Sequence, residues 1–143
     1  MTVIACDGRT MAADSCCSGD GMIHNDSTIK IKHLADGRVF GATGDIYTFV
    51  QAAAALDKGE TIDLMADGFE GLILDHTGKC WSMDRYCRIA PVSVPVAAGG
   101  GSHAAMAVML AGHSATFAAE IAARFIVSCG GPIITLAPRE VAA

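Results

Sequence analysis

Thr2 carries the most distinctive chemistry in this sequence, because it becomes the N-terminal residue if Met1 is removed. An N-terminal threonine has a hydroxyl nucleophile and a free α-amine on one residue. The ordinary pKa of that amine is about 7.7–8.0, so near neutral pH it can accept the hydroxyl proton. This pair of groups suits amide hydrolysis. A small residue is also ordinary at position two, so a catalytic interpretation depends on other residues.

The composition fits one domain, which we expect to span residues 1–143 with a core that needs no cross-links. The net charge is −5 and the basic residues are scattered, so we expect no nucleic-acid partner. No apolar run approaches the ~20 residues that span a bilayer, so we expect no membrane association. No secretory signal opens the chain, which predicts a cytoplasmic protein.

Hydrophobic residues make up 52% of the chain, and much of this excess is alanine. The excess favours buried subunit contacts and therefore a homo-oligomer. Six cysteines are present, but two of them are adjacent and no CxxC pair occurs. We expect free thiols in the core rather than disulfides or a zinc site. The five histidines show no metal-ligand spacing.

Turn-forming dipeptides and hydrophobic periodicity predict the strands and helices that would position these residues. Asp-Gly or Thr-Gly turns at 7–8, 36–37 and 77–78 predict three β-hairpins. Strands are predicted over residues 3–6, 10–13, 22–23, 27–34, 39–42, 70–76, 79–83, 96–98 and 133–136. Helices are predicted from 45 to 58, 103 to 111 and 115 to 129, the last capped by Ser114. Residues 15–21 are predicted as a loop, 60–66 as one or two helical turns, and 85–96 as irregular or extended.

This order of elements predicts an α+β fold. Two antiparallel sheets would lie between helical layers, in a four-layer αββα sandwich with one helical layer reduced. The reduced layer follows from the 60–66 segment, which is too short to be a full second helix.

The chain resembles the proteasome β-subunit family of N-terminal nucleophile hydrolases, most closely the bacterial HslV type of threonine peptidase. The resemblance runs from Thr2 to about Leu136. It rests on the Thr-led first strand, Ala13-Asp14, Ile29-Lys30-Ile31, the segment from Phe40 to Gly44, and the segment from Ala98 to Ser102. Each motif alone is weakly specific, and their order and spacing together carry the match.

The resemblance implies roles for four residues. Thr2 matches the nucleophile, Asp14 the aspartate at the end of a strand, and Lys30 the buried lysine, while Gly41 matches the glycine whose N–H faces the oxyanion. A lysine ammonium near the terminal amine would lower the pKa of that amine, and Asp14 would hold the lysine. A structural interpretation also stays open for each of three residues. Asp14 could simply end a strand in a turn, Lys30 could be a solvated strand lysine, and Gly41 could be needed for close packing. Lys32 competes with Lys30 for the role of the buried lysine.

The sequence departs from the family at Gly100, where the family has a serine that assists the terminal amine. Ser102 lies nearby, and we expect it to cap a helix. The family also commonly holds a cation near its last strand, here residues 130–136. The resemblance therefore implies no required cofactor and a structural monovalent cation bound by backbone carbonyls.

The leading hypothesis is a self-compartmentalising threonine peptidase that forms an acyl-enzyme on Thr2. Its implied partners are a peptide or unfolded-protein substrate, further copies of the chain in a ring, and an ATP-dependent unfoldase if the ring closes. One alternative is a catalytically silent relative that forms a ring or shell, which Gly100 and the short helical layer favour. A second alternative is an amidase for non-peptide substrates.

Overall fold

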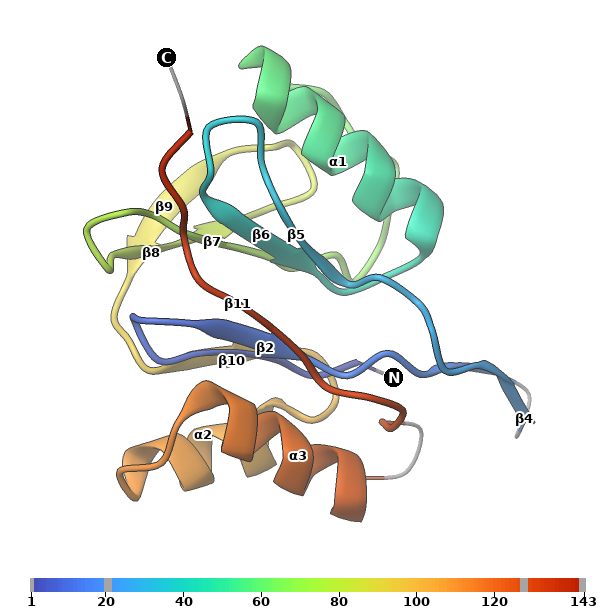
Figure 1. Ribbon diagram of the computed structural model, residues 1–143. Coiled ribbons are helices and arrows are strands. Elements are labelled where there is room, and N and C mark those ends of the chain that lie inside the picture. Colours follow the sequence, from blue (N-terminus) through green and yellow to red (C-terminus); the bar gives the residue numbers. More distant parts are fainter. Residues whose placement is uncertain (1, 20–21, 127–128, 142–143) are drawn as a thin grey trace.

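The computed structural model describes residues 2–19, 22–126 and 129–141, in which two antiparallel sheets lie face to face. Helix α1 (Ile46–Lys58) covers the outer face of one sheet, and helices α2 (Ser102–Leu110) and α3 (Ala115–Phe125) cover the outer face of the other (Figure 1). The predicted αββα sandwich is therefore confirmed. One helical layer holds a single helix in the described residues.

The sheet that begins the chain has the strand order β10-β1-β2-β11. The predicted first hairpin is present, with Cys6 of β1 paired to Met11 of β2. β10 pairs with β1 on one side, and the last strand, β11, pairs with β2 on the other. The bounds of these strands are β1 (Ile4–Cys6), β2 (Met11–Ala13), β10 (Val96–Ala98) and β11 (Ile134–Leu136).

The second sheet is a meander in which each strand pairs with the next along the chain. β9 lies in the segment expected to be irregular or extended, and the extended alternative is correct there. The strand expected over residues 27–34 is shorter than predicted, because regular pairing begins only at Ile31. The strands are β5 (Ile31–His33), β6 (Val39–Ala42), β7 (Gly71–Leu74), β8 (Cys80–Met83) and β9 (Ile89–Val92).

A two-stranded hairpin of β3 (Cys17–Gly19) and β4 (Met22–Asn25) extends away from the sandwich (Figure 1). The prediction of a loop over residues 15–21 was therefore wrong for β3. The Cys, Ser and Gly residues of this segment have low strand propensity. Pairing with β4 supplies the hydrogen bonds that make it a strand.

Helix α1 has the boundaries that the sequence predicts. The Asp45 side chain caps its N-terminus by accepting the Thr48 N–H, and Gly59 ends it with φ 66°. Helix α3 is capped by Ser114, as predicted, and buries a row of alanines against the sheet. The N-cap of α2 is Gly101, so the expectation that Ser102 caps this helix was wrong.

Three clusters of buried side chains hold the layers together. One lies between α1 and its sheet around Phe40 and Phe49, whose rings stack with centroids 5.4 Å apart. A second, mostly of alanines, lies between the other sheet and α2 and α3. A third fills the space between the two sheets around Ile4, Met11 and Leu74. All six cysteines are free, and all but the half-buried Cys17 are buried, as expected.

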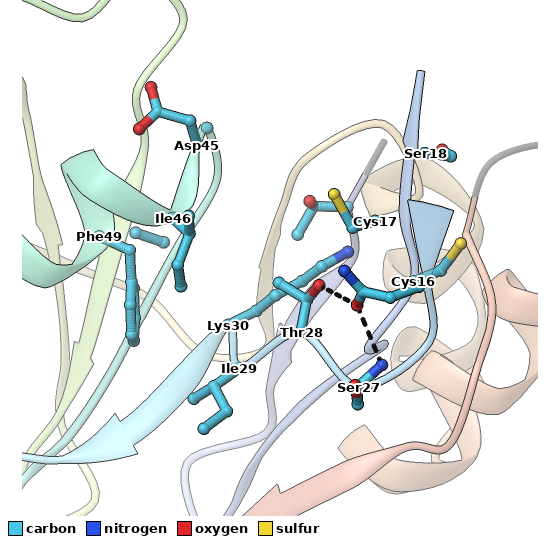
Figure 2. Close-up of a pocket in the computed structure, with 14 residues that line it drawn as sticks. Cys16, Cys17, Ser18, Ser27, Thr28, Ile29, Lys30, Asp45, Ile46 and Phe49 are labelled. Atoms are coloured by element: carbon cyan, nitrogen blue, oxygen red, sulfur yellow. Dashed lines mark hydrogen bonds between the residues drawn. The ribbon is translucent and has the colours of Figure 1, made fainter. Parts of the chain in front are cut away.

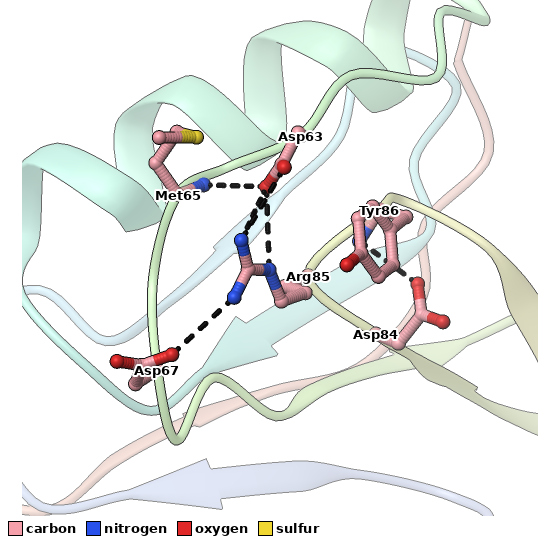
Figure 3. A network of polar contacts seen from close by, with 6 residues as sticks. All are labelled: Asp63, Met65, Asp67, Asp84, Arg85 and Tyr86. Atoms are coloured by element: carbon pink, nitrogen blue, oxygen red, sulfur yellow. Dashed lines mark hydrogen bonds and ion pairs between the residues drawn. The ribbon is translucent and has the colours of Figure 1, made fainter.

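The segment after α1 forms no helix, so the prediction of one or two turns over residues 60–66 was wrong. The Asp63 carboxylate accepts the Met65 N–H, and Met65 adopts φ 55°, a left-handed conformation that a right-handed helix excludes. The Arg85 guanidinium then binds Asp63 at 3.0 Å and Asp67 at 3.3 Å (Figure 3). Polar contacts with the β8–β9 turn thus replace a second helix in this layer.

Among the described residues, no helix is both long enough and apolar enough to cross a bilayer.

Candidate active site

Thr2 lies two residues before the start of β1, where the loop between β10 and α2 fixes its backbone. The Gly101 N–H donates to the Thr2 carbonyl oxygen at 3.1 Å. A Cβ on Gly99 would lie 2.1 Å from the same oxygen, so only glycine allows this close approach. The glycine-rich segment thus positions the candidate nucleophile.

Asp14 lies at the end of β2 and is 1% exposed. Its Oδ1 accepts hydrogen bonds from the Val3 N–H at 3.1 Å and from Lys30 Nζ at 2.9 Å. Its Oδ2 accepts the Gly130 N–H at 3.1 Å. A buried carboxylate needs such partners, and here one of them is the residue that follows Thr2.

Lys30 lies just before β5 and is 8% exposed, whereas Lys32 in the strand is exposed. The structure therefore brings Lys30 and Asp14 together as a buried ion pair and excludes the interpretation of Lys30 as a solvated strand lysine. Lys30 also lines a cavity of about 530 Å³ together with Thr2. Lys32 is absent from this cavity.

The cavity lies between the N-terminal end of α1 and the segment that leads into β3 (Figure 2). Ile46 and Phe49 form one side, Cys16 and Cys17 the other, and Lys30 extends between them. Thr28 is held in its wall because its hydroxyl donates to Asn25 Oδ1 at 2.6 Å. The cavity thus combines apolar side chains with the Lys30 ammonium and the Asp45 carboxylate beside Thr2.

Gly41 lies in the middle of β6, opposite Ile31 and Leu72. A Cβ there would lie 2.6 Å from Ile31 Cγ2 and 2.9 Å from Met11 Sδ, so Gly41 faces the space between the sheets. The structure does not bring Gly41 to the cavity. Gly44, three residues later, lines it with Thr2, and within the described chain its N–H donates no hydrogen bond.

Glu70 is a residue near Thr2 that the sequence did not indicate. Glu70, Gly99, Gly100 and Thr2 line a second cavity of about 480 Å³, which Gly44 also borders. Glu70 is placed there by the pairing of β6 with β7, since it lies opposite Thr43. No local sequence signal reports this long-range pairing.

Gly100 carries no hydroxyl to the second cavity, and Ser102 lines neither cavity that contains Thr2. The Cys129 thiol is a poor competitor for the role of nucleophile. Burial raises the pKa of the Cys129 thiol and the Asp14 carboxylate raises it further, while Lys30 lowers it. A thiol with a raised pKa stays protonated at neutral pH and is a weak nucleophile.

The segment expected to hold a cation packs against the end of β2. The Gly130 carbonyl accepts the N–H groups of Ser15 and Cys16, both at 3.1 Å, and the Pro132 carbonyl accepts the Ser15 hydroxyl at 2.6 Å. These carbonyls therefore already have protein donors. Among the described residues, no group of three or more His, Cys, Asp or Glu side chains could hold a metal ion.

No family model and no curated protein matches this chain in sequence. Solved structures match it over nearly its whole length. Thiobacillus denitrificans BPH has a TM-score of 0.73 at 18% identity, and the match covers 99% of both chains. The same protein in complex with epoxomicin has a TM-score of 0.72 at 19% identity, covering 100% of both chains.

Eukaryotic HslV from Trypanosoma brucei has a TM-score of 0.72 at 17% identity, covering 95% of this chain and 98% of that one. At these identities the matches establish the fold. The chain therefore has the fold of HslV and of Thiobacillus denitrificans BPH, as its resemblance to the HslV type predicted.

Proposed function

We propose that this chain, once Met1 is removed, is a threonine-type peptidase that hydrolyses amide bonds through an acyl-enzyme on Thr2. The observation that supports it most is the Asp14 carboxylate. Its Oδ1 accepts both the Lys30 ammonium and the N–H of Val3, the residue after Thr2. One buried carboxylate thus ties a cation to the start of the strand that carries the nucleophile.

In this mechanism the α-amine of Thr2 accepts the hydroxyl proton as Oγ attacks the substrate carbonyl carbon. The resulting ammonium gives that proton to the leaving amine, and an ester on Thr2 remains. A water then attacks the ester, the amine again accepts a proton, and the acid product leaves. The Lys30 ammonium favours the neutral amine by lowering its pKa, and Asp14 holds Lys30 in position.

The N–H of Gly44 is the donor that we assign to the developing oxyanion, in place of Gly41. Gly44 borders both cavities that contain Thr2, and its N–H has no acceptor within the described chain. Gly44 adopts φ 105°, a conformation that L residues rarely reach. A preorganised N–H at this point would stabilise the charge that forms on the substrate oxygen.

The substrate class is a peptide or an unfolded protein, and the active form is a homo-oligomeric ring. Large apolar side chains remain exposed on α1, α2 and α3, including Tyr47, Leu110 and Phe125. Their burial between copies of the chain would explain the high apolar content. If the ring closes around the cavities, an ATP-dependent unfoldase would be needed to deliver folded substrates.

The test compares Thr2→Ala and Thr2→Ser with the wild type, each confirmed by mass to lack Met1, on a library of quenched fluorescent peptides. Thr2→Ala should abolish hydrolysis, because it removes the nucleophile and leaves the amine. Thr2→Ser, the matched control, should retain measurable hydrolysis because it keeps both groups. Hydrolysis by Thr2→Ala at the wild-type rate would reject the proposal.

A catalytically silent ring- or shell-forming protein is the second candidate. The observation that favours it is the second cavity, where Gly100 brings no hydroxyl to Thr2. This candidate predicts that the processed protein assembles but cleaves no peptide in the library. A non-peptide amidase would instead leave the peptides intact and cleave members of a panel of simple amides.

A further inference from the structure

Three hydrogen bonds hold Glu70 beside Thr2, two of them to its backbone and one to its side chain. The Glu70 N–H donates to Thr43 Oγ1 at 3.0 Å, and the Glu70 carbonyl accepts the Thr43 N–H at 2.9 Å. The side chain is exposed, and its Oε2 accepts the Gly99 N–H at 3.3 Å. Gly99 also packs against the Thr2 carbonyl, so the same glycine contacts both the Glu70 carboxylate and the candidate nucleophile.

Glu70 is the one ionisable side chain that lines the second cavity within the described chain. Much of the remaining wall is glycine, including Gly44, Gly99 and Gly100, which leaves room for a substrate side chain. The second carboxylate oxygen, Oε1, accepts no hydrogen bond within the described residues. A carboxylate with one oxygen oriented by a backbone N–H and the other oxygen open is suited to binding a cation.

The two cavities that contain Thr2 differ in character. The first has apolar side chains at Ile46 and Phe49, and its two charged groups, Lys30 and Asp45, are already engaged with Asp14 and with the start of α1. The second combines backbone and polar groups with the Glu70 carboxylate. Thr2 and Gly44 border both. An extended peptide that crosses Thr2 can therefore place one side chain in each cavity.

We propose that Glu70 selects substrates with a lysine or arginine directly beside the cleaved bond. This inference rests on the proposed function and adds a substrate class to it. A long basic side chain reaches across the glycine wall and meets Oε1, while Oε2 keeps its bond to Gly99. The hydrogen bond from Gly99 orients the carboxylate before the cation binds, which reduces the side-chain entropy lost on binding. The charge pair is partly solvated, so its effect on rate is moderate.

The test uses peptides that differ only in the residues on either side of the cleaved bond. Lysine, norleucine and glutamate are placed at each position in turn, and kcat/KM is measured for the processed protein. At one of the two positions, lysine should exceed norleucine by about fivefold and glutamate should be the poorest, as expected for a partly solvated charge pair.

Glu70→Gln is the informative variant because its amide oxygen can still accept the Gly99 N–H. Its kcat/KM for the lysine peptide should fall to about that for the norleucine peptide, so that the preference for lysine is lost. Glu70→Lys should reverse the preference toward glutamate. Glu60→Gln is the matched control: it removes an exposed carboxylate at the end of α1, outside both cavities, and should keep the lysine preference.

Equal rates for lysine and norleucine at both positions, with hydrolysis that depends on Thr2, would overturn this inference and leave the proposed function in place. A lysine preference that persists in Glu70→Gln would also overturn it. If no peptide is cleaved with Thr2 intact, the proposed function fails and the inference fails with it.

Discussion

The Lys30 ammonium lies 2.9 Å from Asp14 Oδ1, with both side chains buried at the start of the first strand. Burying two charges is costly, and good pairing with further hydrogen bonds offsets that cost. Here the further bonds come from the N–H groups of Val3 and Gly130. Asp14 thus links β1, β2, Lys30 and the segment that leads to the last strand.

Replacing Asp14 with asparagine should lower the free energy of unfolding by about 3–5 kcal/mol, because it removes the carboxylate that neutralises the buried Lys30. Urea unfolding followed by circular dichroism would measure the loss. The double variant Asp14→Asn/Lys30→Met should recover part of it, since no buried charge then remains. The control is Asp84→Asn, which removes the exposed ion pair with Arg88 but keeps a side-chain oxygen for the N–H groups of Tyr86 and Arg88, so it should shift the unfolding midpoint far less than Asp14→Asn. An Asp14→Asn protein as stable as this control would contradict the account.

Gly41→Ala should destabilise the fold by about 1–3 kcal/mol, because the new methyl group would overlap Ile31 and Met11 between the sheets. Gly130→Ala is the matched control, since its Cβ would meet Cys16 Cβ at an ordinary 3.7 Å. Thermal unfolding of both variants would measure the difference. Equal melting temperatures for Gly41→Ala and the wild type would show that Gly41 is not packed as described.

Asp75 offers a test of pH dependence. Burial raises the pKa of its carboxyl, but hydrogen bonds from Thr77, Trp81 and Lys79 outweigh burial and lower that pKa to about 2. Its folded pKa is thus below the unfolded value of about 3.9, so its contribution is present above about pH 4 and lost as pH falls toward 2.

Asp75→Asn should therefore lower the free energy of unfolding by about 1 kcal/mol at pH 7, a value that allows for solvent screening. The difference from the wild type should vanish near pH 2. Trp81 is the single tryptophan, and its Nε1 donates to Asp75 Oδ2 at 3.0 Å, so its fluorescence reports both unfolding and the local contact. A difference that persists unchanged at pH 2 would contradict the assignment.

Ser114→Ala should cost about 1 kcal/mol of stability, because the Ser114 hydroxyl accepts the Phe117 N–H at the start of α3. Ser102→Ala is the natural control. Ser102 is the first residue of α2 and makes no capping hydrogen bond, so its replacement should leave stability unchanged. Urea unfolding of the two variants side by side would decide whether the hydroxyls differ in this way.

The sequence predicts best those helices and turns whose determining residues lie within or next to the element itself. Asp7-Gly8 makes a tight hairpin, and Asp45 and Gly59 begin and end α1, because each signal lies within a few residues of its effect. The 60–66 segment was predicted wrongly since its conformation depends on Arg85, some twenty residues later. The β3 strand likewise depends on its partner β4.

The residues of the candidate site also fall into two groups, those that the sequence indicated and those that depend on long-range strand pairing. Residue types and a family resemblance pointed to Thr2, Asp14 and Lys30. Alternation along a strand could not separate Lys30 from Lys32, because regular pairing starts at Ile31 and leaves Lys30 outside it. Glu70 and Gly44 reach Thr2 through the register of β6 with β7 and the turn that follows β6. Local pattern carries no information about either contact.

The measurement that tests the central claim most directly is the intact mass of the purified protein before and after incubation with a peptide epoxyketone such as epoxomicin. Such inhibitors react with both the hydroxyl and the free amine of an N-terminal threonine. A threonine peptidase that uses Thr2 should lose Met1 and gain one inhibitor adduct that maps to Thr2. A protein that lacks Met1 and gains no adduct would contradict the claim.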